Sequence, residues 1–124
     1  MIEIVETHEA PTPIGPYSQA IRAGGFIFVS GQIPMNPKTG QIVQGGLESQ
    51  THQVIKNISA ILAAAGSDLN RIVKTTVFLV NLEDFPAFNR IYEEYFGGTK
   101  PARATVQVAR LPKDALLEIE AIAF

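Results

Sequence analysis

The fold is decided by residues 47–80, LESQTHQVIKNISAILAAAGSDLNRIVKTTVFLV. From Leu47 to Ala65, apolar side chains return at helical spacing, at Val54, Ile55, Ile58, Ile61, Leu62 and Ala65. Gly66 then supplies a helix stop. From Arg71 to Val80, β-branched and apolar residues occupy nearly every position, as in a strand that is buried on both faces. The stretch therefore predicts a helix over 47–65 and a central strand over 71–80.

More strands and a second helix are expected on either side of this stretch. The β-rich runs Ser18–Arg22 and Phe26–Ser30 flank Gly24-Gly25, which is typical of a hairpin. Asp84–Phe96 carries an aromatic stripe at helical spacing, and Gly97-Gly98 ends it.

The chain ends in two further predicted strands, Ala102–Ala109 and Ala115–Phe124, and Arg110–Asp114 between them has the composition of a hairpin connection. This order of strands and helices predicts an α+β fold, a mixed sheet with both helices on one face. The other face would expose a large apolar patch, because strands such as Phe26–Val29 carry apolar side chains on both faces. We therefore expect an oligomer, whose subunit number the pattern does not fix.

The composition restricts the class of protein. With 124 residues, the chain has the size of one domain, 1–124, with a single core. An apolar fraction of 46% and a net charge of -2 indicate a globular chain without a preference for nucleic acid. Cysteine is absent, which excludes disulfides and thiol nucleophiles. No segment reaches the roughly 20 apolar residues of a membrane span, so we expect a soluble, cytoplasmic protein.

Polar side chains alternate along both C-terminal strands. Arg103, Thr105 and Gln107 share one face of the first, and Glu118 and Glu120 share one face of the second. If these strands pair directly, only a register that matches polar face with polar face keeps the apolar residues together. We therefore expect Arg103 and Thr105 to lie beside Glu118 or Glu120.

An arginine and a glutamate on one surface can bind and hydrolyse a small acid. The guanidinium binds a carboxylate through two parallel charge-assisted hydrogen bonds, and the glutamate can hold or deprotonate a water molecule. The alternative is a purely structural cross-strand ion pair, worth about 0.2–1 kcal/mol, and spacing alone favours this alternative.

Other candidate residues have ordinary structural interpretations. His8 and His52 are isolated and lack the spacing of metal ligands, so no metal site is predicted. Ser30 has no base at a recognisable spacing to activate it. Tyr17 can be a core aromatic residue whose hydroxyl reaches the surface, and Asn89 can be a polar helix position.

Four motifs, in order along the whole chain, resemble the Rid (reactive intermediate deaminase, or YjgF) family. They are Ile14–Ala20 (IGPYSQA), Val29–Pro34 (VSGQIP), Val73–Leu79 (VKTTVFL), and Pro101–Arg103 (PAR) together with Glu118–Ala123 (EIEAIA). The resemblance implies a chorismate-mutase-like α+β subunit that assembles as a homotrimer, with a pocket at each of the three subunit interfaces.

The resemblance also assigns roles to residues. It places the family's carboxylate-binding arginine at Arg103 and its water-positioning glutamate at Glu118, as the two catalytic residues. The substrate-binding residues that it implies are Tyr17, Ser30, Asn89, Arg103 and Thr105. Thr105 stands where many relatives carry cysteine, and the pocket contact at that position is often made by the backbone.

The activity implied by the resemblance is hydrolysis of 2-imino acids, such as 2-iminobutanoate and 2-iminopropanoate, to 2-keto acids and ammonia. It needs no cofactor or metal, and the partner is a small molecule rather than a nucleic acid or a membrane. One alternative is a binding module that senses a keto acid in the same Arg103 pocket without turnover. A second is an RNA-cleaving or translation-inhibiting protein, which a pI of 5.6 disfavours. A third is a holdase-like surface protein, whose function would not depend on Arg103.

Overall fold

The structure, a computed structural model, describes all 124 residues. The six strands are β1 (Glu3–Val5), β2 (Ala20–Ala23), β3 (Phe26–Gln32), β4 (Ile72–Leu79), β5 (Ala102–Gln107) and β6 (Leu117–Ala123). The helices are α1 (Gly46–Ala64) and α2 (Phe85–Phe96), with short 3-10 turns η1 (Leu69–Arg71), η2 (Leu82–Asp84) and η3 (Pro112–Asp114). Both predicted helices and all five predicted strands are present, and β1 is additional.

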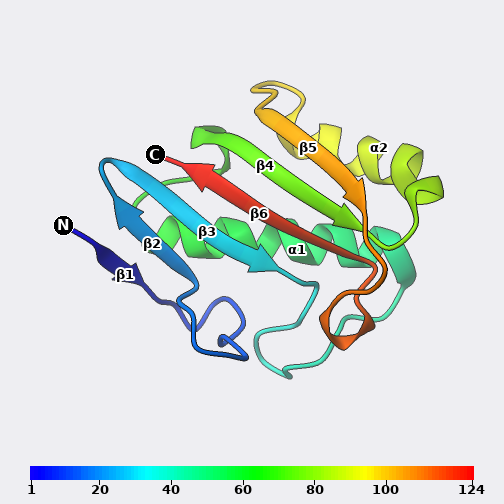
Figure 1. The fold of residues 1–124 in the computed structure, drawn as a ribbon, viewed down its shortest axis with the longest axis horizontal. Coiled ribbons are helices and arrows are strands. Elements are labelled where there is room, and N and C mark those ends of the chain that lie inside the picture. The colour runs from blue at the N-terminus through cyan, green and yellow to red at the C-terminus, as the bar shows by residue number, and fades with distance from the viewer.

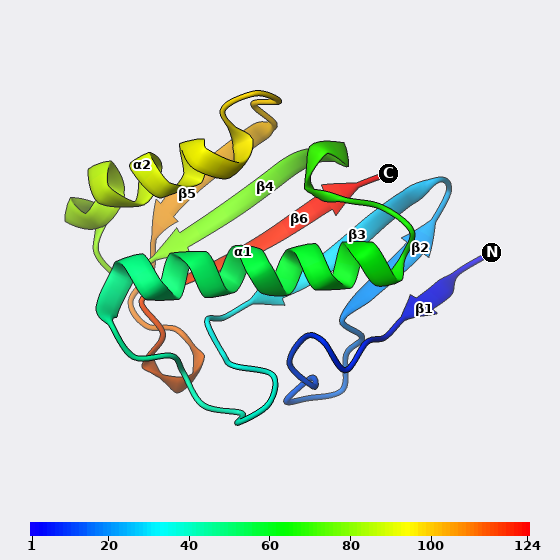
Figure 2. The same cartoon turned by 180° about the vertical axis from the view of Figure 1, so that it is seen from behind.

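The strands form one sheet in the order β1-β2-β3-β6-β4-β5. β4 and β5 run parallel, and every other neighbouring pair is antiparallel. Both helices lie against the same face of the sheet, as Figures 1 and 2 show from opposite sides. The predicted α+β fold, a mixed sheet with both helices on one face, is therefore confirmed.

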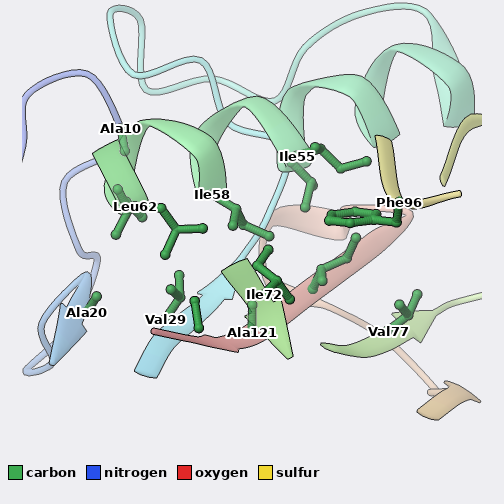
Figure 3. Packing of buried hydrophobic residues seen from close by; sticks show 14 of the residues in the cluster. Ala10, Ala20, Val29, Ile55, Ile58, Leu62, Ile72, Val77, Phe96 and Ala121 are labelled. Atoms are coloured by element: carbon green, nitrogen blue, oxygen red, sulfur yellow. The ribbon is translucent and has the colours of Figure 1, made fainter. Parts of the chain in front are cut away.

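The helix α1 crosses the middle of the sheet and supplies the core. Its predicted apolar stripe is fully buried, with Val54, Ile55, Ile58, Ile61 and Leu62 all at 0% exposure. Ile55, Ile58 and Leu62 point from α1 towards the sheet (Figure 3). Gly66 follows the helix with a φ of 77°, a left-handed conformation that favours glycine, so the predicted stop is confirmed.

The helix α2 covers the end of the sheet that contains β4 and β5 (Figure 2). Its aromatic stripe packs inward, and Phe88 and Phe96 are buried. It begins one residue later than predicted, because Leu82–Asp84 forms the 3-10 turn η2 instead. Neither α-helix combines the length and the apolar character that a membrane crossing requires.

The first predicted hairpin, β2–β3, is confirmed. Gly24 and Gly25 form its turn with φ angles of 58° and 83°, which only glycine adopts at little cost. β3 does not end at Ser30, as predicted, but continues to Gln32. Its pairing with β6 shifts by one residue between Val29 and Gln32, which is a β-bulge.

The second predicted hairpin is wrong, because β4 lies between β5 and β6. β4, α2 and β5 form a strand-helix-strand crossover, and such a connection places its two strands side by side and parallel. The segment after β5 then carries the chain past β4 to the middle of the sheet. It includes η3, in which Lys113 and Asp114 adopt left-handed φ angles of 57° and 55°.

The sheet face that carries no helix exposes large apolar side chains to solvent in the single chain. Phe26 and Phe28 of β3 are 44% and 45% exposed on it. β4 is therefore not buried on both faces, since only every second side chain along most of its length is buried. The predicted bare apolar face is confirmed, and we call it the bare face below.

Candidate active site in two halves

Arg103 lies on the helix side of β5, over α2. Its guanidinium carbon is 4.8 Å from the ring centroid of Tyr92 and 5.2 Å from that of Phe85. Its Nη1 donates a hydrogen bond of 2.8 Å to Oδ1 of Asn89. These four residues, Phe85, Asn89, Tyr92 and Arg103, form what we call the β5–α2 cluster.

The aromatic rings hold the cation in place without neutralising it. Ring faces attract a guanidinium electrostatically, and this attraction is compatible with solvent exposure. The hydroxyl of Tyr92 shares a hydrogen bond of 2.7 Å with the buried Thr75 hydroxyl of β4, which fixes the ring. Burial raises the pKa of Tyr92, although the Thr75 hydrogen bond and Arg103 oppose the rise, so the phenol stays neutral.

Arg103 makes no ion pair within the chain. The two ion pairs of the structure join Arg22 with Glu3 and Arg110 with Asp114. The alternative of a cross-strand ion pair at Arg103 is therefore wrong. An arginine has five N–H donors, and only one of them donates to Asn89. The exposed guanidinium can therefore still bind a carboxylate through a bidentate pair of hydrogen bonds.

Thr105 follows on the same side of β5, but its hydroxyl is not open to a ligand. Oγ1 is buried and has no hydrogen-bond partner. The backbone offers the better contact, because β5 is the edge strand. The N–H of Val108 donates to the carbonyl of Leu79, so the backbone of Val108 points to β4. Successive residues of a strand point their backbone groups to opposite sides, and the N–H and C=O groups of Arg103 and Thr105 therefore point away from β4, to the open edge of the sheet.

A second group of predicted site residues surrounds a hollow on the bare face. This β3–β6 hollow has a volume of about 530 Å³ and is lined by Ile14, Tyr17, Ser30, Gly31, Ile33, Pro112, Glu118 and Glu120. Such a volume suits a small organic molecule.

The rim of the hollow is held in place by the loop that precedes β2. The buried side chain of Gln19 accepts from the N–H of Thr7 and donates to the carbonyls of Thr7, Ala10 and Pro11. Ser30 donates a hydrogen bond of 2.6 Å to the carbonyl of Ser18. Tyr17 is thereby delivered to the mouth of the hollow, where it is 47% exposed. These hydrogen bonds fix the loop, and the interpretation of Tyr17 as a core aromatic is wrong.

Glu118 is the carboxylate of the hollow that lacks a partner. Its carboxylate is half-buried and makes neither a hydrogen bond nor an ion pair within the chain. Burial raises the pKa of Glu118, and the neighbouring Glu120 carboxylate raises it further. A carboxylate with a raised pKa is a better base towards water, and this combination of burial and a missing partner is typical of functional sites.

The predicted pairing of Arg103 with a glutamate is wrong within one chain. Arg103 pairs with Thr75, which faces the helices, whereas Glu118 pairs with Phe78 and faces the other way. The two residues are two strands apart, about 10 Å, and about another 10 Å apart along the strands. The alternation within each strand is predicted correctly, but β5 and β6 are not neighbours. One small molecule cannot contact both side chains of one chain.

The six predicted site residues thus fall into two incomplete halves. Asn89, Arg103 and Thr105 belong to the β5–α2 side, and Tyr17, Ser30 and Glu118 belong to the β3–β6 hollow. Sequence reasoning missed Phe85, Tyr92 and Gly31. The sequence predicts the aromatic stripe of α2, but only the parallel pairing of β4 and β5 shows that this stripe lies under Arg103.

The two histidines lie outside both halves. His8 is in the leading loop, and His52 Nδ1 is 2.6 Å from the Tyr95 hydroxyl, in a shallow groove between α1 and α2. No three histidine, aspartate or glutamate side chains lie close enough together to hold a metal ion.

Comparison with known proteins identifies the family. The family model described as endoribonuclease L-PSP matches residues 7–124. A RutC family protein of Pyrococcus horikoshii is 59% identical over 124 residues, covering 100% of this chain and 98% of that protein. The mouse 2-iminobutanoate/2-iminopropanoate deaminase is 49% identical over 121 residues, covering 98% of this chain and 90% of that enzyme.

Solved structures agree with the sequence comparison. A protein of the conserved Rid family from Yersinia pestis superposes with a TM-score of 0.96 at 52% identity, covering 99% of this chain and 98% of that one. The whole fold is therefore shared, and the chain belongs to the endoribonuclease L-PSP family, which includes the RutC and Rid proteins.

Proposed function

We propose that the protein is a cofactor-free deaminase that hydrolyses 2-imino acids, such as 2-iminobutanoate and 2-iminopropanoate, to 2-keto acids and ammonia. The observation that carries the proposal is the division of the site. One half has an exposed arginine that is held in place but carries no counter-ion, and the other has a half-buried glutamate without a partner. The name of the mouse relative supports this substrate class.

We further propose that the two halves meet between copies of the chain in a homotrimer. The edge of β5 from one copy would approach the β3–β6 hollow of the next. This arrangement would also cover apolar surface on the bare face, where Phe26 and Phe28 are exposed.

In the proposed reaction, Arg103 binds the carboxylate of the imino acid and the Thr105 backbone N–H orients its reacting end. Glu118 of the neighbouring copy accepts a proton from water while the water oxygen bonds to the imine carbon. The imino acid enters as the iminium, already protonated on nitrogen, so this addition gives a neutral carbinolamine. Glu118 then returns its proton to the amino nitrogen, the carbon–nitrogen bond breaks, and the departing ammonia takes the hydroxyl proton, which yields keto acid and ammonium.

The required acceleration is modest, because free imines hydrolyse readily in water. Orientation of the carboxylate and one general base can each contribute several powers of ten, so no metal or cofactor is needed in this scheme. The raised pKa of Glu118 suits the role, since a stronger base accepts the proton of water more readily.

The basic test uses imines generated in situ from an amino acid by an oxidase, with a buffer blank. Arg103→Ala and Glu118→Ala should both lose the acceleration seen with the wild type. Arg71→Ala is a matched control, because Arg71 also lies over an aromatic ring, that of Phe124, but belongs to neither half. Equal rates for the wild type and both site variants would refute the mechanism. Tight keto-acid binding by a wild type that does not accelerate imine loss would favour the sensor instead.

A complementation test addresses the shared site. Arg103→Ala and Glu118→Ala chains, each inactive alone, are refolded together in equal amounts. If every site combines two chains, about a quarter of the interfaces in the mixed trimers should contain both intact halves and recover activity. A mixture as inactive as its components would exclude a site shared between copies.

A further inference from the structure

The β-bulge of β3 lies directly beside the proposed base. Val29 pairs with Ala121 and Gln32 pairs with Ile119. Between these two pairs, β3 therefore contains one residue more than β6. Ser30 and Gly31 are the residues that the bulge leaves without a regular partner. A bulge of this kind redirects side chains locally, and bulges occur next to active sites more often than elsewhere.

Gly31 stands where the Glu118 carboxylate needs space. A β-carbon built on Gly31 would lie 1.9 Å from Oε2 of Glu118, 2.8 Å from its Cδ and 3.2 Å from its Cγ. The carboxylate therefore occupies the volume that any other residue at position 31 would fill.

The backbone at position 31 gives no other reason for glycine. Gly31 is absent from the glycines with positive φ, in contrast to Gly24 and Gly25 of the neighbouring turn. Its φ is not in the left-handed region that favours glycine, and the three heavy atoms nearest to an added β-carbon all belong to Glu118. The requirement for glycine here comes from the glutamate and not from the chain path.

We infer that Gly31 is a positioning residue, which holds the Glu118 carboxylate in the β3–β6 hollow by leaving its volume empty. The inference rests on the proposed function, because the position of the Glu118 carboxylate affects the reaction rate only if Glu118 is the general base. The inference also assigns a role to the bulge, because Gly31 is one of its two residues and lies beside the Glu118 carboxylate.

An alanine at position 31 should disturb the site without disturbing the fold. The clash falls on the far end of a flexible side chain, so Glu118 can rotate away into the hollow while β3 keeps its place. The Arg103 half is untouched, so substrate binding should remain.

The test compares Gly31→Ala with Gly98→Ala, a matched control in which the added β-carbon meets nothing within 4 Å and φ is not positive. Gly31→Ala should lower kcat by about tenfold to a hundredfold, as expected for a misplaced catalytic group, with KM nearly unchanged. Gly98→Ala should keep wild-type kcat. Unchanged kcat in Gly31→Ala would overturn the inference.

A double-mutant cycle with Glu118→Asp separates positioning from general damage. The shorter carboxylate should cost much less activity in the Gly31→Ala background than in the wild type, because there the glutamate is already displaced. Equal losses in both backgrounds would show that the two positions act independently, and would overturn the inference.

An NMR titration of the Glu118 carboxyl keeps this test independent of the deaminase proposal. Glu120 and Tyr17 are the other titratable groups that line the hollow, and both stay in place in Gly31→Ala. The pKa of Glu118 should fall towards its ordinary value in Gly31→Ala, since the displaced carboxylate gains water, and should not move in Gly98→Ala. An unchanged pKa would overturn the positioning role. A wild type that fails to hydrolyse imines would instead refute the proposed function, whatever the titration gives.

Discussion

Arg103 and Glu118 each belong to half of a candidate site, but the chain surrounds them in different ways. Arg103 rests on the rings of Tyr92 and Phe85 and donates to Asn89, at a place where solvent reaches it. Glu118 lies half-buried in a hollow, without a hydrogen bond, beside a second carboxylate. The cation is fixed and keeps its charge, whereas the carboxylate is destabilised in its charged form.

This difference suits two different tasks. A group that binds the carboxylate of a substrate works best when its geometry is prepared beforehand, because little entropy is then lost on binding. A general base works best when its pKa lies closer to the working pH than that of a free carboxyl group. Changes on the Arg103 side should therefore act mainly on KM, and changes on the Glu118 side mainly on kcat.

The largest effect is expected from Glu118→Gln. The amide keeps the size of the side chain but cannot accept a proton, so kcat should fall by about 10²- to 10⁴-fold while KM changes little. Steady-state kinetics with imines generated in situ measures both constants. A rise in KM with kcat preserved would assign Glu118 to binding and break the proposed division of labour.

A smaller effect, on KM instead of kcat, is expected from Arg103→Lys. The ammonium keeps the charge but loses the planar fork and the stacking on Tyr92 and Phe85. Loss of one charge-assisted hydrogen bond, about 1.5–3 kcal/mol, corresponds to roughly 10- to 100-fold in KM. Arg71→Lys, over the Phe124 ring, is the control and should leave KM unchanged. If kcat falls while KM is preserved, the arginine contributes to the chemical step instead.

Glu120→Gln should move the pH dependence without abolishing activity. Glu118 must be ionised to accept a proton, so kcat/KM should fall as the pH drops through its raised pKa. Burial is the main cause of that rise and the Glu120 charge adds to it. Removing this charge should lower the pKa of Glu118 and shift the acid limb of the profile to lower pH. A profile that stays in place, as it should for Glu48→Gln on α1, would exclude Glu118 as the titrating group.

The sequence predicts the helices and strands well because their signals are local. The stripe of α1 and the glycine turn between β2 and β3 need only the spacing of neighbouring residues, and both are confirmed. It is also predicted correctly that Arg103 and Thr105 share one face of their strand and that Glu118 and Glu120 share one face of theirs, since strand alternation is local too.

What the local signals could not supply is the neighbour of each strand. The short connection at Arg110–Asp114 suggested that β5 and β6 pair, but the strand-helix-strand order of β4, α2 and β5 places β5 beside β4. That order was visible in the sequence and was the better guide, because parallel neighbours need a crossover of a dozen residues or more. The position of Gly31 under Glu118 depends on a one-residue shift in register, which no local pattern reveals.

The smallest effect concerns stability, and it compares the two threonines on the helix side of the sheet near Arg103. The Thr105 hydroxyl is buried without a partner, whereas the Thr75 hydroxyl bonds to Tyr92. Valine has nearly the same shape as threonine but no hydroxyl. An unsatisfied buried hydroxyl costs about 1–3 kcal/mol, so Thr105→Val should raise the free energy of unfolding by about 1 kcal/mol, and Thr75→Val should lower it by a similar amount. Chemical denaturation measures both changes.

The proposed contact of Thr105 with substrate comes from its backbone N–H, which Thr105→Val keeps. The activity of this variant should therefore stay within about twofold of the wild type. Loss of a hydrogen bond between the Thr105 hydroxyl and the substrate would instead lower the activity about tenfold. A stabilised but inactive Thr105→Val would show that the hydroxyl turns to the substrate once the second copy is in place. The β5 edge would then contribute side-chain chemistry as well as backbone to the half of the site that binds the acid.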